Sequence, residues 1–191
     1  MKLNKALDYT LLVDRLRAKG IIFYAGLSEA EITTIEQTFN FCFPLDFKAF
    51  LHTALPASEG FIHWRQALYS GKIEREVKQR FNTPIEGVLY DVMKNDFWLD
   101  VWGEKNLNLD SRKDHFDKIS NQCPVLIPLY RNRYMATSLH TGGNPVYSVY
   151  NSDIICTGND LACWMKTEFN LALPGNYQAD KNPVQFWDDF L

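Results

Sequence analysis

The segment from residue 123 to residue 169 constrains the fold most, because short apolar runs alternate with turn residues along it. Apolar and aromatic residues, many of them β-branched, occupy 125–127, 134–136, 146–150 and 154–157, and arginine, asparagine, glycine and serine separate these runs. Such composition is typical of strands joined by tight turns. Short connections of this kind join antiparallel neighbours, so the segment predicts an antiparallel β-meander.

A helix is predicted to close this segment. Asp160 is of a residue type that caps helix N-termini. The apolar residues after it recur at helical spacing, namely Leu161, Trp164, Met165 and Phe169. Pro174 and Gly175 are predicted to end the helix, and the aromatic tail that finishes at Leu191 is predicted to dock on the domain.

The first half of the chain is predicted to be mainly helical. An amphipathic pattern begins with Leu3 and Leu7 and ends at Gly20, and a second helix begins with the capping box of Ser28 and Glu31 and closes at Asn40. A third helix is expected from Pro44 to Pro56. Beyond it, the sequence predicts a helix over 73–81 that ends at 82–84, a strand over 88–93 and a surface helix or excursion within 104–122.

Together these patterns predict an α+β fold, with a mostly antiparallel sheet, N-terminal helices and a closing C-terminal helix packed on it. The 191 residues fit one domain, 1–191.

Charge and hydropathy bear on the class of partner. Lys and Arg number 20 and Asp and Glu 23, so the formal net charge is −3 and no basic field exists to neutralise phosphates. Direct nucleic-acid binding is therefore disfavoured. No apolar run approaches the roughly 18 residues of a membrane span, and the first ten residues lack the apolar core of a secretory signal. We expect no membrane partner and a cytoplasmic location.

The residues that could carry chemistry form no recognisable catalytic or metal motif. The four histidines are isolated from one another and from the cysteines, so no metal and no cofactor is predicted. The four cysteines are interpreted as buried, reduced thiols, and Asp91, Asp96, Asp100 and Glu104 as solvated charge. The stretch from Thr141 to Asn144 leads into Pro145 and a strand, which favours a plain turn over a phosphate-binding loop.

Aromatic and arginine side chains are the best candidates for contact with a partner, since these residue types dominate protein interfaces. Arg131 and Arg133 flank Asn132 in a predicted connection between strands, where both guanidinium groups could face outward. The predicted partner-binding residues are Trp98, Trp102, Arg131, Arg133 and Tyr134. The alternative for each aromatic ring is a place in the core, and the alternative for the two arginines is ordinary surface charge.

A family resemblance adds to these patterns. Residues 26–51, GLSEAEITTIEQTFNFCFPLDFKAFL, resemble the opening of the SUKH superfamily, which contains bacterial toxin-immunity proteins and a fungal regulator of cell-wall synthesis. The matching features are Glu36 on a capped helix, an apolar-Pro-x-Asp-aromatic start to the next helix, and a Phe-Leu pair. The segments EGVLYDVMKNDFWLDVWG, IPLYRNRYMATSL and GGNPVYSVYNSDIICTGNDLACWMKTEF resemble a longer subgroup.

The resemblance covers residues 26–170, which leaves 1–25 as an extra helix and 171–191 as a tail. The subgroup tends to have a histidine where this chain has Asn132, so a role that requires an imidazole there does not carry over.

The resemblance implies an α+β domain without catalytic residues. Many bacterial members bind and neutralise a toxin, often a nuclease, so the expected function is that of a non-enzymatic immunity protein with a protein partner. One alternative is a regulatory or scaffolding module. The other is an enzyme or small-molecule-binding protein, in which His63, His115 or His140 would meet Asp91, Asp96 or Asp100 in a closed pocket.

Overall fold

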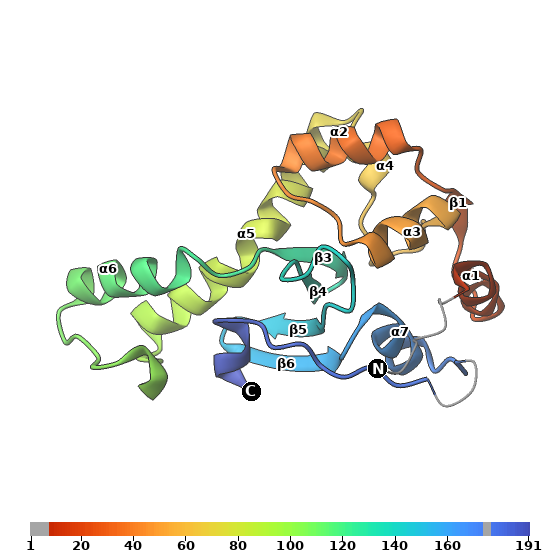
Figure 1. Cartoon of the computed structure of the whole chain (residues 1–191). Coiled ribbons are helices and arrows are strands. Elements are labelled where there is room, and N and C mark those ends of the chain that lie inside the picture. Colours follow the sequence, from red (N-terminus) through yellow and green to blue (C-terminus); the bar gives the residue numbers. More distant parts are fainter. Residues whose placement is uncertain (1–7, 174–176) are drawn as a thin grey trace.

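The structure is a computed structural model that describes residues 8–173 and 177–191 (Figure 1). Its helices are α1 (Tyr9–Ala18), α2 (Glu29–Phe39), α3 (Leu45–Thr53), α4 (Trp64–Ala67), α5 (Gly71–Lys94), α6 (Leu109–Ser120) and α7 (Leu161–Phe169), with short 3-10 helices η1 (Asp100–Trp102) and η2 (Trp187–Phe190). The strands form two antiparallel sheets. The predicted α+β class is therefore confirmed.

The larger sheet is the predicted meander. Its strands are β3 (Leu126–Tyr130), β4 (Arg133–Ala136), β5 (Val146–Tyr150) and β6 (Asp153–Gly158), paired antiparallel in the order β3-β4-β5-β6. The tight turns after β3 and β5 contain Arg131 and Asn151, whose φ angles of 46° and 52° lie in the left-handed region. A left-handed residue lets the chain reverse within two residues, which keeps these two hairpins short.

A second, two-stranded sheet was not predicted. β1 (Phe23–Ala25) pairs with β2 (Ala54–Pro56), which follows directly after α3. The third helix therefore ends at Thr53 and does not extend to Pro56, because the last three residues of the expected helix pair with β1.

The helix signals at residues 28–44 are confirmed in detail. Ser28 and Glu31 form a reciprocal capping box, and Asn40 ends α2 with a φ of 55°. Pro44 is the N-cap residue of α3. Glu36 accepts a hydrogen bond from the Phe43 N–H at 2.8 Å and pairs with Lys48 at 3.2 Å, so it fixes the connection between the two helices.

Helix α5 corrects two predictions. Residues 82–84 do not break it, and residues 88–93 are helical and not a strand. Pro84 lies inside the helix, where it removes one backbone donor at a cost of about 3 kcal/mol. Val77 before the proline and Val88 and Val92 after it are buried at helical spacing, and this burial outweighs the missing bond.

The larger sheet separates two hydrophobic clusters, because alternate side chains point to opposite faces. Met135 belongs to the first cluster, with the N-terminal helices and α7, whereas its neighbours Tyr134 and Ala136 belong to the second, with α6 and the tail. Helix α5 contributes Val77 to the first cluster and Val88 to the second. Figure 1 shows α5 running diagonally past one side of the sheet toward α6.

The tail docks on the domain, as predicted. Trp187 is 1% exposed, and its Nε1–H donates to the Pro124 carbonyl at 2.7 Å. The Tyr147 hydroxyl donates to the Asp188 carboxylate at 2.7 Å. Helix α7 ends at Phe169 with a left-handed Asn170, while Pro174 and Gly175, like Leu3 and Leu7, lie outside the described residues.

The cysteine prediction was wrong for Cys42, which is exposed, whereas Cys123, Cys156 and Cys163 are partly buried; all four are free thiols. Burial raises the pKa of the Cys123 thiol to about 11. Within residues 8–173 and 177–191, no helix is both long enough and apolar enough to cross a bilayer.

The ion pair of Glu31 and Arg65 yields a prediction on acid stability. The Glu31 carboxylate accepts hydrogen bonds from Arg65 Nε at 2.5 Å and from the Ser28 N–H at 2.8 Å. The hydrogen bond from Arg65 is the largest influence, and it lowers the pKa of Glu31 from 4.5 to about 2. Since the folded pKa is depressed, this pair stabilises the fold above about pH 4.5, and the contribution is lost as the pH falls toward 2.

We expect Glu31→Gln to destabilise the fold by about 1 to 2 kcal/mol at pH 7, a range reduced for solvent screening of this partly exposed pair. Glutamine retains a capping-box side chain, so the helix start is kept. Urea unfolding of both proteins from pH 7 to pH 2 should show the difference shrinking with acidity. A difference that stays constant over this range would contradict the ion-pair explanation.

Candidate functional site

A cavity of about 310 Å³ lies where α5 meets the turns of two hairpins; we call it the arginine pocket. Helix α5 contributes Arg80 and Thr83. The β3–β4 and β5–β6 hairpins contribute Arg131, Asn132, Tyr134, Val149, Tyr150 and Asn151. The pocket thus combines two guanidinium groups, two phenol rings and amide side chains, and none of its lining residues is acidic.

Asp91 on α5 holds the β5–β6 turn against the helix. Its carboxylate accepts hydrogen bonds from Ser152 N–H at 3.0 Å, Ser152 Oγ–H at 2.6 Å and Asn151 Nδ2–H at 3.2 Å. Burial acts to raise the pKa of Asp91, but these hydrogen bonds to the ionised form outweigh it and keep the pKa below its usual value. The interpretation of Asp91 as solvated charge was therefore wrong, because the side chain is 7% exposed and anchors a turn.

Close backbone packing supports the same anchor. A Cβ atom added to Gly87 would lie 3.0 Å from the Cα of Asn151, so glycine lets the helix approach the turn. The position of Asn151, which lines the arginine pocket, is consequently fixed by its close packing against α5.

Arg131 is held by its backbone and by an aromatic ring. Its N–H donates to the Gly60 carbonyl at 2.8 Å, and its guanidinium carbon lies 5.0 Å from the centroid of the Tyr130 ring. A cation over a ring face is stabilised by the quadrupole of the ring. The side chain of Arg131 is exposed, as the sequence predicted, but its position is constrained.

Arg80 reaches the pocket from α5. Its guanidinium carbon lies 5.8 Å from the centroid of the Tyr134 ring. Among the described residues, its buried Nε and Nη2 atoms have no hydrogen-bond partner. Burial raises the pKa of the Tyr134 hydroxyl, and the positive charge of Arg80 opposes that rise. A buried donor without an acceptor costs about 1 to 3 kcal/mol. An anion that accepted hydrogen bonds from Arg80 would remove this cost and would therefore be stabilised there.

The five predicted partner-binding residues do not form one surface. Arg131 and Tyr134 both line the arginine pocket, although Tyr134 is 3% exposed, so its prediction as an outward-facing residue was wrong. Its side chain faces the second hydrophobic cluster because β4 alternates between the two faces of the sheet.

Arg133 points to the opposite face of β4. Its Nε donates to Glu168 of α7 at 2.8 Å, and its Nη1 donates to Asn132 at 2.6 Å and to Ser148 at 2.9 Å. This arginine connects the sheet to α7, so most of its donors are already used within the chain.

Trp98 and Trp102 belong to an aromatic group beside α6 and the tail. The Trp102 ring stacks on Phe186 with centroids 5.7 Å apart and is 6% exposed, so it was wrongly predicted as a contact surface. Trp98 is half-buried, and its ring lies 5.2 Å from that of His115. Trp102 was misassigned because the docked tail buries it, and the sequence does not indicate where the tail docks.

Sequence reasoning missed Arg80, Tyr90 and Tyr150. Tyr150 and Tyr90 are 73% and 55% exposed. Tyr90 lies about two helical turns after Thr83 on the same side of α5. One signal was present: Arg80 lies three residues after Val77 and four before Pro84, so it interrupts the apolar stripe of a helix that continues through the proline.

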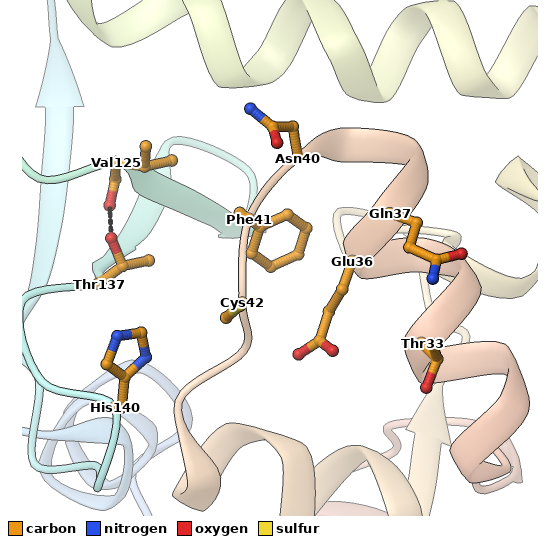
Figure 2. Close-up of a pocket in the computed structure, with 9 residues that line it drawn as sticks. All are labelled: Thr33, Glu36, Gln37, Asn40, Phe41, Cys42, Val125, Thr137 and His140. Atoms are coloured by element: carbon orange, nitrogen blue, oxygen red, sulfur yellow. Dashed lines mark hydrogen bonds between the residues drawn. The ribbon is translucent and has the colours of Figure 1, made fainter.

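A second cavity of about 510 Å³ lies between the end of α2 and the segment after β4. Figure 2 shows Cys42 on the central segment, with His140 on one side of it in this view and Glu36, which extends from α2, on the other. Glu36 is engaged by Phe43 and Lys48, and the Thr137 hydroxyl donates to the Val125 carbonyl at 3.0 Å. Two polar groups of this cavity, those of Glu36 and Thr137, therefore connect segments of the fold.

The turn at residues 141–144 binds an anion of the chain itself. The Gly143 N–H donates to the Asp46 carboxylate at 2.9 Å. A Cβ atom on Gly142, whose φ is +101°, would lie 2.6 Å from Asp46 Cγ. This confirms the interpretation as a turn, and its glycines are required by the approach of Asp46 at the start of α3.

The described residues contain no group of three or more His, Cys, Asp or Glu side chains that could hold a metal ion. Over the same residues, no hydrogen bond joins His63, His115 or His140 to Asp91, Asp96 or Asp100. Asp96 instead pairs with Lys105 at 2.6 Å and with Arg112 at 3.1 Å.

Comparisons of the chain with protein-family models, with curated proteins and with solved structures found no significant match.

Proposed function

We propose that this chain is a non-enzymatic, cytoplasmic protein-binding domain, an immunity protein that binds and neutralises a toxin. The observation that carries the proposal is the surface at the arginine pocket, where the lining residues Arg131 and Tyr150 are exposed. Tyr90 is exposed on the same side of α5 as the lining residue Thr83. Tyrosine and arginine supply most of the binding energy in many protein interfaces, and a backbone that is already fixed reduces the entropy lost on binding.

The framework of this surface supports the proposal. Asp91 fixes the β5–β6 turn, and Gly60 fixes the β3–β4 turn through the Arg131 N–H. Two fixed turns and a helix therefore hold the side chains of this surface in place before a partner binds. The resemblance of residues 26–170 to the SUKH superfamily supports a toxin domain as the class of partner.

Charge is compatible with a basic toxin such as a nuclease. The net charge of −3 gives mild long-range attraction to a basic partner, while the local positive charge of the arginine pocket adds specificity at contact.

The proposal predicts protection of cells that produce the cognate toxin. Cells that co-express this chain with a toxin encoded beside its gene should grow, and the purified proteins should form a stable complex. Tyr150→Ala should weaken that complex by at least about tenfold, because truncation of a central interface tyrosine removes about 2 kcal/mol or more and tenfold corresponds to about 1.4 kcal/mol. Titration calorimetry on the purified pair would measure the loss.

Tyr24→Ala is the matched control. Tyr24 is also exposed, at 55%, but it lies on β1, far from the β5–β6 turn in Figure 1, so the variant should bind as tightly as the wild type. If the wild-type chain neither protects cells nor binds the toxin, the proposed function is wrong.

A further inference from the structure

The arginines differ in how their charge is compensated. The sequence contains eight arginines, and four of them pair with carboxylates, namely Arg17, Arg65, Arg112 and Arg133. Arg15 donates to the Ala172 carbonyl. Among the described residues, Arg75, Arg80 and Arg131 have no carboxylate within 4.0 Å, and the last two both line the arginine pocket.

Two acidic groups on neighbouring elements are already occupied. Asp91 accepts four hydrogen bonds, from Asn95, Asn151 and Ser152, and Glu168 is paired with Arg133. The pocket therefore gathers two positive charges that the described part of the chain does not neutralise.

The lining indicates the kind of anion. The planar guanidinium forks of Arg80 and Arg131 match a planar carboxylate. The rings of Tyr134 and Tyr150 and the side chain of Val149 form an apolar wall, which suits a carboxylate carried on a short aliphatic stem. A free phosphate has no such stem, and the net charge of −3 does not favour a polyanion.

We propose that the arginine pocket receives the carboxylate of an acidic side chain on the protein partner, an inference that rests on the proposed protein-binding function. The bound carboxylate lies between the two guanidinium groups. A rotation of the Arg80 side chain toward the pocket then gives the buried Nε–H and Nη2–H the acceptor that they lack in the free chain. Thr83 and Asn132 complete the polar rim.

A small carboxylate tests the pocket without any partner. Glutarate, which carries a carboxylate on an aliphatic stem, is titrated into the ¹⁵N-labelled chain while the Nε–H resonance of Arg80 is followed. A saturable shift is expected, with none for sodium chloride at equal ionic strength. Arg131→Asn should weaken glutarate binding about tenfold, since it removes one charge-assisted contact. Asparagine tolerates the left-handed backbone at this position, so the turn is kept.

Arg75→Gln is the control, because Arg75 is exposed on the same helix outside the pocket, and glutarate binding should be unchanged. No shift of Arg80 with glutarate, or tighter binding of inorganic phosphate than of glutarate, would overturn the carboxylate assignment.

The toxin complex separates this inference from the proposed function. Arg80→Met and Arg131→Asn should each weaken toxin binding by at least about tenfold while the chain stays folded, as judged by circular dichroism. Wild-type affinity in both variants would overturn the carboxylate subsite and leave the immunity function standing. If glutarate binds but the wild-type chain does not bind the toxin, the immunity function fails and the carboxylate chemistry of the pocket stands.

Discussion

Gly26→Ala is expected to destabilise the fold by about 3 kcal/mol or more, because the new methyl group has no space. A Cβ atom at this position would lie 1.8 Å from the His52 carbonyl oxygen and 2.5 Å from its carbon, and both atoms belong to the backbone of α3. The flanking chain cannot move away freely. Leu27 N–H donates to the Leu51 carbonyl at 2.9 Å, and His52 Nδ1 lies 2.7 Å from the Leu27 carbonyl oxygen.

Thermal and urea unfolding would measure this loss, and a fall in Tm of roughly 6 to 12 °C corresponds to 3 kcal/mol for a chain of this length. Gly71→Ala is the matched control. Gly71 begins α5 with no atom within 4 Å of an added Cβ, so alanine there should be neutral or slightly stabilising. Equal stability of the two variants would show that α3 can move away from Gly26 at little cost.

Trp187→Ala should cost about 3 to 5 kcal/mol, the range for truncation of a buried aromatic residue. The ring of Trp187 is almost fully buried and packs edge-on against Phe186 at 5.0 Å. The substitution also leaves the Pro124 carbonyl without its donor. The tail should consequently detach more readily, which exposes the second hydrophobic cluster.

Urea unfolding gives the free energy, and limited proteolysis reports whether the tail becomes accessible. Leu191→Ala serves as a control in the same tail, because Leu191 is 58% exposed and its truncation should change stability by less than about 0.5 kcal/mol. If Trp187→Ala behaved like this control, the docking of the tail would contribute little to the stability of the fold.

Much of the local structure could be predicted, because its causes are local. The capping box of Ser28 and Glu31, the left-handed Asn40 and the Asp160 cap each depend on a few adjacent residues. The meander was predictable for the same reason, since its turns and strands alternate over short distances.

The predictions failed where distant burial decides the structure. Pro84 is a helix-breaking signal, yet α5 continues because valines on both sides of it are buried in different clusters. Residues 88–93 alternate in polarity like a strand, but Asp91 and Val92 are both buried while Tyr90 is exposed, which fits a helix and not a period of two. The pairing of β1 with β2 joins segments about thirty residues apart, and no short-range signal specifies it.

The candidate site was predicted in part. Arg131 was correctly predicted in an exposed turn, because a strand connection between polar residues is a surface feature. Arg80 could be found only once α5 was known to be continuous, since only then do its side chain and the hairpin turns meet. Trp102 and Tyr134 were misassigned because an aromatic residue between polar neighbours can fill a core as readily as an interface.

The continuity of α5 has a consequence for how the chain folds. A helix of 24 residues is about 36 Å long, and this one packs in both hydrophobic clusters. If the packing of one cluster were lost, α5 would fray. The other cluster would then lose the side chains that this helix contributes to it. We therefore expect the two halves of the chain to form and melt together as one cooperative unit, with the proline at the middle of the helix marking the joint between them.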